Sequence, residues 1–445
     1  MHTFKLLTKR KFAPLFWVQF FGAFNDNLFK NSLLLLIALR AVSESESGFL
    51  INMASGLFIL PFIIFAAIAG QLADKFEKSR LIRYTKLFEI AIMVLGGAAL
   101  YSQQFGLLLG VLFLMGTHSS IFGPLKYSIL PQHLNEDELI AGNGLVEMGT
   151  FLAILLGTIG AGMLLNRGSA YVAAATIGVS IVGWFCSRFI PPAPSADPHL
   201  KIKKNPIPET KNLIALASSQ MTVFLSILGI SWFWFFGATI LAQLPSFTKF
   251  IIYGNDQIVT LLLATFSISI GLGSMLCERL SRGDVEIGMV PFGATGMTLF
   301  CLDLFLMTYP PAGELVGIGD FFKDRGSFSP IRLLSDIAGI GLFGSFFIVP
   351  LYALIQQRSD ERYRSRIVAA NNLINSLFMV ASALMTMILF KFGATTPQIF
   401  LTIALLNLAV TTYIFALVPE FALRFAFWLL ASTIYNLRYQ GREHL

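Results

Sequence analysis

Long apolar runs alternate with short polar or charged connections along the whole chain. A helix needs roughly 20 mostly apolar residues to cross the hydrocarbon core of a bilayer. Twelve runs approach or exceed that length, and each is predicted to be a membrane-spanning helix. Their expected bounds are 13–40, 49–73, 81–101, 105–130, 139–165, 169–190, 218–248, 257–278, 287–309, 333–356, 366–390 and 398–419.

The composition supports this interpretation. Hydrophobic residues make up 55% of the 445 residues and charged residues only 13%, whereas soluble domains carry about 25% charged residues. The expected fold class is therefore an all-α polytopic membrane protein. Cys186, Cys277 and Cys301 fall in or at the ends of spans without metal-ligand spacing, so neither a metal site nor a cofactor is expected.

The basic residues are distributed unevenly between the two sides of the predicted membrane. With the N-terminus inside, 24 of the 32 Lys and Arg residues fall on the cytoplasmic side, 7 fall outside and Lys30 lies within a span. Cytoplasmic connections of membrane proteins carry such an excess. Both termini are therefore predicted to be cytoplasmic. The net charge of +7 is attributed to this bias and to contact with membrane lipids, and no nucleic-acid partner is expected.

The chain repeats itself in two halves. The segment 17-WVQFFGA-23 resembles 232-WFWFFGA-238, and 140-IAGNGLVE-147 resembles 368-VAANNLIN-375. A stretch rich in Pro and Lys separates the halves six spans to six. The expected domains are an N-terminal half 1–190, a cytoplasmic linker 191–217, a C-terminal half 218–419 and an amphipathic cytoplasmic tail 420–445.

Two six-span halves joined by a cytoplasmic linker are the plan of the major facilitator superfamily, whose substrate site lies between the halves. The segment 70-GQLADKFEKSR-80 resembles the signature of that superfamily between its second and third spans, and only Ser79 departs from it. A glycine allows close helix approach, and an acid with nearby bases can form a charge-assisted latch. The resemblance implies that the latch opens in one access state, although a generic basic turn is an alternative. The expected latch residues are Gly70, Asp74, Lys75 and Arg80.

The first span carries ionisable residues near its middle. At about 100° per residue, Gln19, Asp26 and Lys30 share one helical face, with Asn27 beside them. Asp26 precedes Lys30 by four residues, the favourable order for a direct ion pair. Each charge at bilayer depth costs about 2.5–3.5 kcal/mol. We therefore expect these groups to face a wet cavity or a partner helix, and a purely structural ion pair is the alternative.

Other spans add polar or aromatic residues to the candidate site. Pro124 predicts a kink beside Lys126, which could instead extend toward the lipid headgroups, and Asn371 could instead join two helices. His118 is taken as a satisfied polar residue or, less readily, as a proton carrier. The candidate substrate-binding residues are Gln19, Asn25, Asp26, Asn27, Lys30, Lys126, Asn143, Glu147, Trp232, Trp234, Asn371 and Asn375.

Three segments resemble a narrower family. They are 20-FFGAFNDNLFKNSL-33, 122-FGPLKYSILPQHL-134 and 138-ELIAGNGLVEMGT-150. They are similar to the bacterial lysophospholipid transporters of the major facilitator superfamily, and the likeness extends over about 12–419. The branch that looks closest is fused to a 2-acylglycerophosphoethanolamine acyltransferase. The H-x-x-x-x-D signature of that enzyme does not occur in this sequence, so the chain is expected to be a transporter with a fused or separate acyltransferase as partner.

The resemblance implies alternating-access transport of lysophosphatidylethanolamine and lysophosphatidylglycerol from the outer to the inner leaflet of a bacterial inner membrane, for reacylation. In this hypothesis Lys30 and Lys126 face the phosphate, while Asp26 and Glu147 face a headgroup amine. One rival is an exporter of drugs or small metabolites on the same fold. Another is a lipid-remodelling enzyme with a vestigial transporter half. Coupling to protons or sodium through Asp26, Glu147 or Asp303 is left open.

Overall fold

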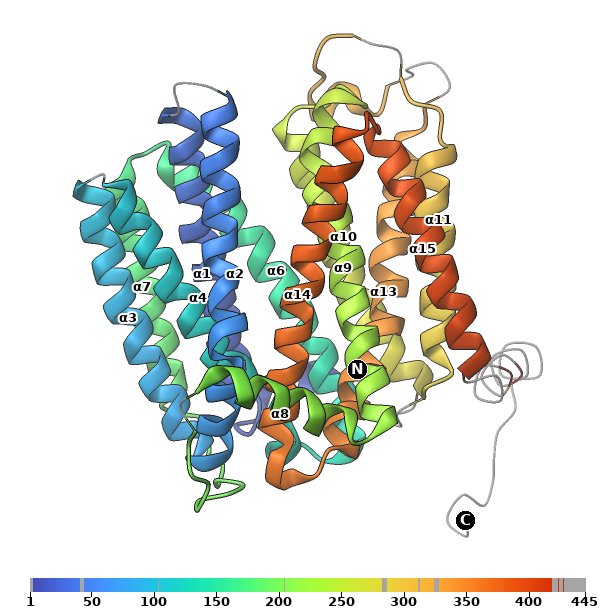
Figure 1. The fold of residues 1–445 in the computed structure, drawn as a ribbon. Coiled ribbons are helices and arrows are strands. Elements are labelled where there is room, and N and C mark those ends of the chain that lie inside the picture. The colour runs from blue at the N-terminus through green and yellow to red at the C-terminus, as the bar shows by residue number, and fades with distance from the viewer. Residues whose placement is uncertain are drawn as a thin grey trace.

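The computed structural model of the protein consists of long helices running side by side (Figure 1). It describes residues 3–40, 44–102, 104–203, 205–281, 286–310, 313–323 and 328–417, together with Leu423 and Phe427. Apart from those two residues, the expected tail 420–445 lies outside the described residues. No β-strand occurs in the described part, which confirms the all-α prediction.

The helices before the linker form one group. They are α1 (Ala13–Arg40), α2 (Glu44–Lys75), α3 (Lys78–Ser102), α4 (Phe105–Ser128), α5 (Leu130–His133), α6 (Leu139–Leu165) and α7 (Ser169–Ser187). After the linker come α8 (Pro206–Ser218), α9 (Met221–Phe250), α10 (Asp256–Ser281), α11 (Met289–Leu306), α12 (Ile318–Phe321), α13 (Pro330–Arg358), α14 (Arg364–Lys391) and α15 (Thr396–Leu417).

The long helices match the predicted spans closely. Within the described residues, 11 helices are long and apolar enough to cross a membrane, so the chain is a multi-pass membrane protein. The 28-residue α1 falls outside that set because its central Asn, Asp and Lys residues lower its mean hydropathy. Its observed bounds, Ala13–Arg40, coincide with the predicted 13–40.

The linker contains a helix that the sequence analysis did not predict. Asn205 caps α8 by accepting a hydrogen bond from the Ile207 N–H at 3.2 Å, and Pro206 occupies the first helical position, where a missing N–H costs nothing. The helix α8 contacts α2, α9 and α14, and so touches both groups. We call the side of the molecule that carries residues 188–218 the linker side, and the opposite side the far side.

The two groups of helices meet beside α8 and diverge toward the far side (Figure 1). Side chains of the two groups contact each other on the linker side of the molecule. The rings of Tyr127 and Tyr352 stack with centroids 4.3 Å apart. The side chains of Asn143 and Gln356 exchange hydrogen bonds of 2.7 and 3.0 Å. The structure is therefore closed on the linker side.

The structure corrects the position of two lysines. The count of 24 Lys and Arg residues on the cytoplasmic side includes Lys86 and Lys126. Lys86 is instead fully buried in α3, and Lys126 lies within α4, where it lines a cavity. The excess of basic residues on one side persists without them, because they are only two of the 24 residues counted there.

Candidate functional site

A cavity of about 280 Å³ lies between the two groups of helices. Residues of α1, α2, α4 and α6 line it from one half, and residues of α9, α13 and α14 line it from the other. Its wall combines charged and amide groups with aromatic rings. Of the predicted substrate-binding residues, those that line the cavity are Gln19, Asp26, Asn27, Lys30, Lys126, Trp234 and Asn375.

The helix α1 supplies the polar stripe that its periodicity predicted. Ser119 of α4 donates a hydrogen bond of 2.5 Å to Asp26 Oδ2, and Thr150 of α6 donates one of 3.1 Å to Gln19 Oε1. These bonds join three helices around the cavity. Because Gln19 and Asp26 meet neighbouring helices at the cavity, the cost of placing them within the membrane is reduced.

Lys30 and Lys126 bring two ammonium groups to the cavity. The predicted direct pair between Asp26 and Lys30 is not formed: among the described residues, no carboxylate lies within 4.0 Å of either lysine nitrogen. Lys30 Nζ lies 5.5 Å from the centre of the Phe58 ring, and Lys126 Nζ lies 4.6 Å from that of Tyr127. Two cations without a direct ion-pair partner make this cavity suited to an anionic group.

Stacked tyrosines close the linker-side end of the cavity. Tyr127 and Tyr352 both line it, and Tyr127 donates a hydrogen bond of 2.5 Å to Glu147 Oε1. The carboxylate of Glu147 is completely buried and does not line the cavity. Asn143 is likewise buried, against Gln356. The structure therefore places Asn143 in the contact between the halves and Glu147 behind Tyr127, both outside the cavity.

Three further predicted residues lie outside the cavity. Asn25 turns toward α3 and donates a hydrogen bond of 3.0 Å to Glu89. Trp232 donates one of 2.7 Å from Nε1 to Asn407 of α15. Asn371 is buried, and the adjacent Asn372 lines the cavity in its place.

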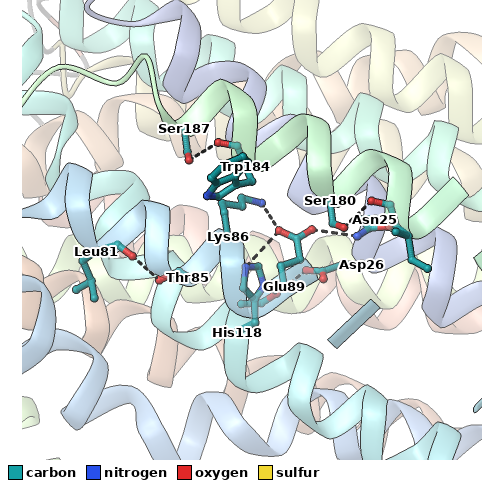
Figure 2. Close-up of polar contacts among 12 residues, drawn as sticks. Asn25, Asp26, Leu81, Thr85, Lys86, Glu89, His118, Ser180, Trp184 and Ser187 are labelled. Carbon is teal, nitrogen blue, oxygen red and sulfur yellow. Dashed lines mark hydrogen bonds and ion pairs between the residues drawn. The ribbon is translucent and has the colours of Figure 1, made fainter. Parts of the chain in front are cut away.

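The sequence analysis did not predict an ionic network between α3 and α4 beside the cavity (Figure 2). Lys86 Nζ lies 2.5 Å from Glu89 Oε2, and His118 Nε2 lies 3.4 Å from the same oxygen. All three side chains are almost wholly buried. The available signal was the one that identified Asp26 and Lys30, namely opposite charges close together within an apolar run.

The signature segment makes a contact between the halves at the linker side. Asp74 Oδ2 lies 2.9 Å from Arg366 Nε of α14, and its Oδ1 accepts a bond of 3.1 Å from the Ser365 N–H. A Cβ added to Gly70 would lie 2.9 Å from Arg366 Cα, so glycine permits this close approach. The bases expected to join Asp74 do not: among the described residues, neither Lys75 nor Arg80 has a side-chain nitrogen within 4.0 Å of its carboxylate, and Arg366 pairs with it instead.

Glu77 fastens the linker to the turn between α2 and α3. Its carboxylate accepts hydrogen bonds from the N–H groups of Ala193, Ser79 and Arg80 at 2.7, 2.9 and 2.8 Å. Partial burial acts to raise the pKa of Glu77, but these hydrogen bonds outweigh it and hold the pKa below its usual value. Glu77 is therefore a charged anchor for the linker at neutral pH.

Comparison with known proteins defines the class. The profile of the Major Facilitator Superfamily matches residues 15–383. A crystal structure of FucP, a Major Facilitator Superfamily transporter in the outward conformation, superposes with a TM-score of 0.67 at 12% identity, covering 90% of this chain and 97% of that one. The human organic anion transporter MFSD10 gives 0.68 at 14% identity, covering 90% and 99%. At such low identity these two structures show the fold alone.

The chain belongs to the Major Facilitator Superfamily. Within it, the chain is 28% identical over 359 residues to the lysophospholipid transporter LplT of Serratia proteamaculans, covering 80% of this chain and 82% of the relative. The transporter of the same name from Cronobacter sakazakii is 28% identical over 378 residues, covering 83% and 84%. These relatives confirm the resemblance to bacterial lysophospholipid transporters that the motifs indicated. The likeness to the acyltransferase-fused branch stays a prediction.

Proposed function

We propose that this chain carries lysophospholipids across a bacterial inner membrane by alternating access. The observation that supports it most directly is the pair of lysines, Lys30 and Lys126, which face one cavity and have no carboxylate partner within 4.0 Å in the described part of the chain. A glycerophospho headgroup supplies the missing anion. A phosphodiester between two ammonium groups would form charge-assisted hydrogen bonds, which are the strong ones in a site of low dielectric.

The other wall residues suit the rest of the headgroup. Asp26, held by Ser119, is available to the amine of lysophosphatidylethanolamine. For lysophosphatidylglycerol, Asn27 and Asn375 offer amide groups to the glycerol hydroxyls. Glu147 is not assigned to the amine, because its carboxylate is buried behind Tyr127.

The size of the cavity indicates which part of the lipid it holds. Its volume of about 280 Å³ is slightly below the usual range for small-molecule pockets, roughly 300–1,000 Å³. It therefore suits the headgroup, while the single acyl chain extends past Phe58, Phe62 and Met379 toward lipid. A diacyl lipid has a second chain to place, which favours monoacyl substrates.

We place both termini and the linker side in the cytoplasm, because the excess of Lys and Arg lies there. The lysophospholipid would then enter from the outer leaflet, and an acyltransferase, fused or separate, would reacylate it at the inner leaflet. The chain itself would bind and release the lipid without making or breaking a covalent bond.

Transport of a fluorescent lysophosphatidylethanolamine into proteoliposomes tests this function. Lipid that has moved inward resists extraction by external albumin. We expect the fraction of lipid that resists albumin to rise faster in vesicles with the wild-type protein than in protein-free vesicles. Lys126→Ala should slow initial uptake about tenfold at limiting substrate, since one charge-assisted contact is worth about 1.5–3 kcal/mol and 1.4 kcal/mol is tenfold in affinity. Asp26→Asn should impair lysophosphatidylethanolamine more than lysophosphatidylglycerol.

Lys249→Ala is the matched control, because it removes an exposed lysine of α9 outside the cavity. The proposal fails if normally inserted Lys126→Ala protein transports at the wild-type rate, or if wild-type protein is no faster than empty vesicles. Transport of glycerophosphoethanolamine, which lacks the acyl chain, at the same rate as the lipid would instead support a carrier of small metabolites.

A further inference from the structure

A third ammonium group lies directly behind the cavity wall. Lys86 of α3 is fully buried, and its Nζ lies 5.1 Å from the centre of the Phe122 ring. Phe122 is itself part of the cavity lining, as is His118 of the same ionic network. The ammonium is therefore separated from the cavity by little more than one aromatic ring.

Gly22 makes the wall thin at this point. It lines the cavity, and a Cβ added to it would lie only 2.7 Å from Lys86 Nζ. The ammonium thus occupies space that any other residue at position 22 would fill with its own side chain. Because glycine lets other groups approach its backbone closely, Gly22 acts as a window between Lys86 and the cavity.

Glu89 does not depend on Lys86 alone. It also accepts a hydrogen bond of 3.0 Å from Asn25 Nδ2, and His118 Nε2 lies 3.4 Å away. Figure 2 shows these side chains converging on the carboxylate. Removing one partner from a buried pair is costly when it leaves a bare charge. If the lysine turns away, Asn25 stays hydrogen-bonded to Glu89 and the His118 ring stays beside the carboxylate. Part of the compensation therefore remains when Lys86 exchanges to another anion.

We propose that Lys86 is a further ligand for the substrate phosphate and reaches it through the Gly22 window. This inference rests on the proposed lysophospholipid transport and extends its binding site to a residue of α3. An anion in the cavity near Gly22 competes with Glu89 for the ammonium. The phosphodiester is then held by Lys30, Lys86 and Lys126, one each from α1, α3 and α4.

A pair of glycine substitutions tests the window. In Gly22→Ala the added methyl meets the flexible end of Lys86, not backbone, so the protein should fold while the ammonium is pushed back. Gly183→Ala is the matched control, because its Cβ would lie 3.8 Å from the same nitrogen but on α7, which does not line the cavity. Binding of lysophosphatidylethanolamine and of a monoacylglycerol with the same chain is measured by titration of the purified proteins in detergent.

We expect Gly22→Ala to raise the dissociation constant for lysophosphatidylethanolamine about tenfold, the effect of one lost charge-assisted contact. The value for monoacylglycerol, which has no phosphate, should stay within about twofold. Gly183→Ala should resemble wild type for both ligands. The inference is overturned if the two variants bind lysophosphatidylethanolamine equally well, or if Gly22→Ala weakens both ligands alike, since the methyl would then act only by bulk.

A second variant removes the charges without removing volume. Lys86→Gln combined with Glu89→Gln keeps a neutral pair at the same place, and a melting curve shows whether it folds. The folded double variant should lose affinity for lysophosphatidylethanolamine as Gly22→Ala does. If it binds with the wild-type dissociation constant, Lys86 is structural only. If wild-type protein fails to bind lysophosphatidylethanolamine in the first titration, the proposed function itself is wrong.

Discussion

Single ionisable residues in the helices of this protein have two kinds of environment. Lys86 and Glu89 are buried and paired with each other. Lys30 and Lys126 instead face a cavity, and no carboxylate of the described residues lies within 4.0 Å of their nitrogens. A paired charge inside a membrane has part of its desolvation compensated by its partner. An unpaired charge needs an oppositely charged partner that enters and leaves the cavity. This difference is the residue-level reason for assigning an anionic substrate.

The two tryptophans of α9 give a prediction at the same scale. Trp232 Nε1 donates to buried Asn407 at 2.7 Å, whereas Trp234 lines the cavity and its Nε1 lies 3.5 Å from the Tyr352 hydroxyl. Trp232→Phe should lower stability by about 1–3 kcal/mol, because a buried acceptor loses its donor, without changing substrate affinity. Trp234→Phe should weaken binding with little loss of stability. Thermal unfolding and ligand titration of both variants check this, and the opposite assignment of effects would contradict it.

Helix geometry explains which single residues could be predicted. Gln19, Asp26 and Lys30 share a face at 100° per residue, and all three line the cavity. Asn25 stands next to Asp26 in the sequence, yet one residue of rotation along α1 turns it toward Glu89 of α3. Trp232 and Trp234 differ in the same way. Counting 100° per residue along each helix separates Asn25 from Asp26 and Trp232 from Trp234. The burial of Glu147 behind Tyr127 could not be predicted in this way, because it depends on tertiary packing.

At the scale of elements, α2 and α14 form one of the contacts that close the linker side. Gly70 of α2 lies against Arg366 and Ala369 of α14, and Asp74 bonds to Arg366 one turn further along. The sequence indicated the acid and the glycine, because they belong to a recognisable motif. It did not indicate Arg366, which is 292 residues away, since no local pattern specifies a partner at that separation. The helix α8 was overlooked because Pro and Lys dominate the composition around it.

An added methyl on α2 tests the role of this contact. A Cβ at Gly70 would lie 2.9 Å from both Ala369 Cβ and Arg366 Cα, so Gly70→Ala should force α2 and α14 apart. We expect a smaller population of the state that is closed on the linker side. Spin labels on the linker-side ends of the two helices would report it as longer distances. Gly56→Ala is the control on the same helix, since no atom of the described residues lies within 4 Å of its Cβ, and equal distances in both variants would contradict the prediction.

The whole molecule combines two groups of helices with a cavity between them. The spans were predictable because hydrophobic runs are local properties of the chain. The state of the molecule was not, because closure on the linker side depends on long-range contacts such as Tyr127 with Tyr352. Alternating access requires these contacts to separate while the far-side ends of the helices approach each other. The cavity residues would then face the linker side with the same headgroup still bound.

Mapping where the lipid headgroup binds tests the central claim most directly. A lysophosphatidylethanolamine analogue with a photoreactive group on its headgroup would be cross-linked to the purified protein, and the labelled peptides identified by mass spectrometry. The proposed site predicts labels on the cavity segments of α1 and α4, around Asp26, Lys30 and Lys126, that excess unlabelled lipid removes. Labels confined to lipid-facing positions such as Leu107 or Phe185, both more than half exposed, would contradict it.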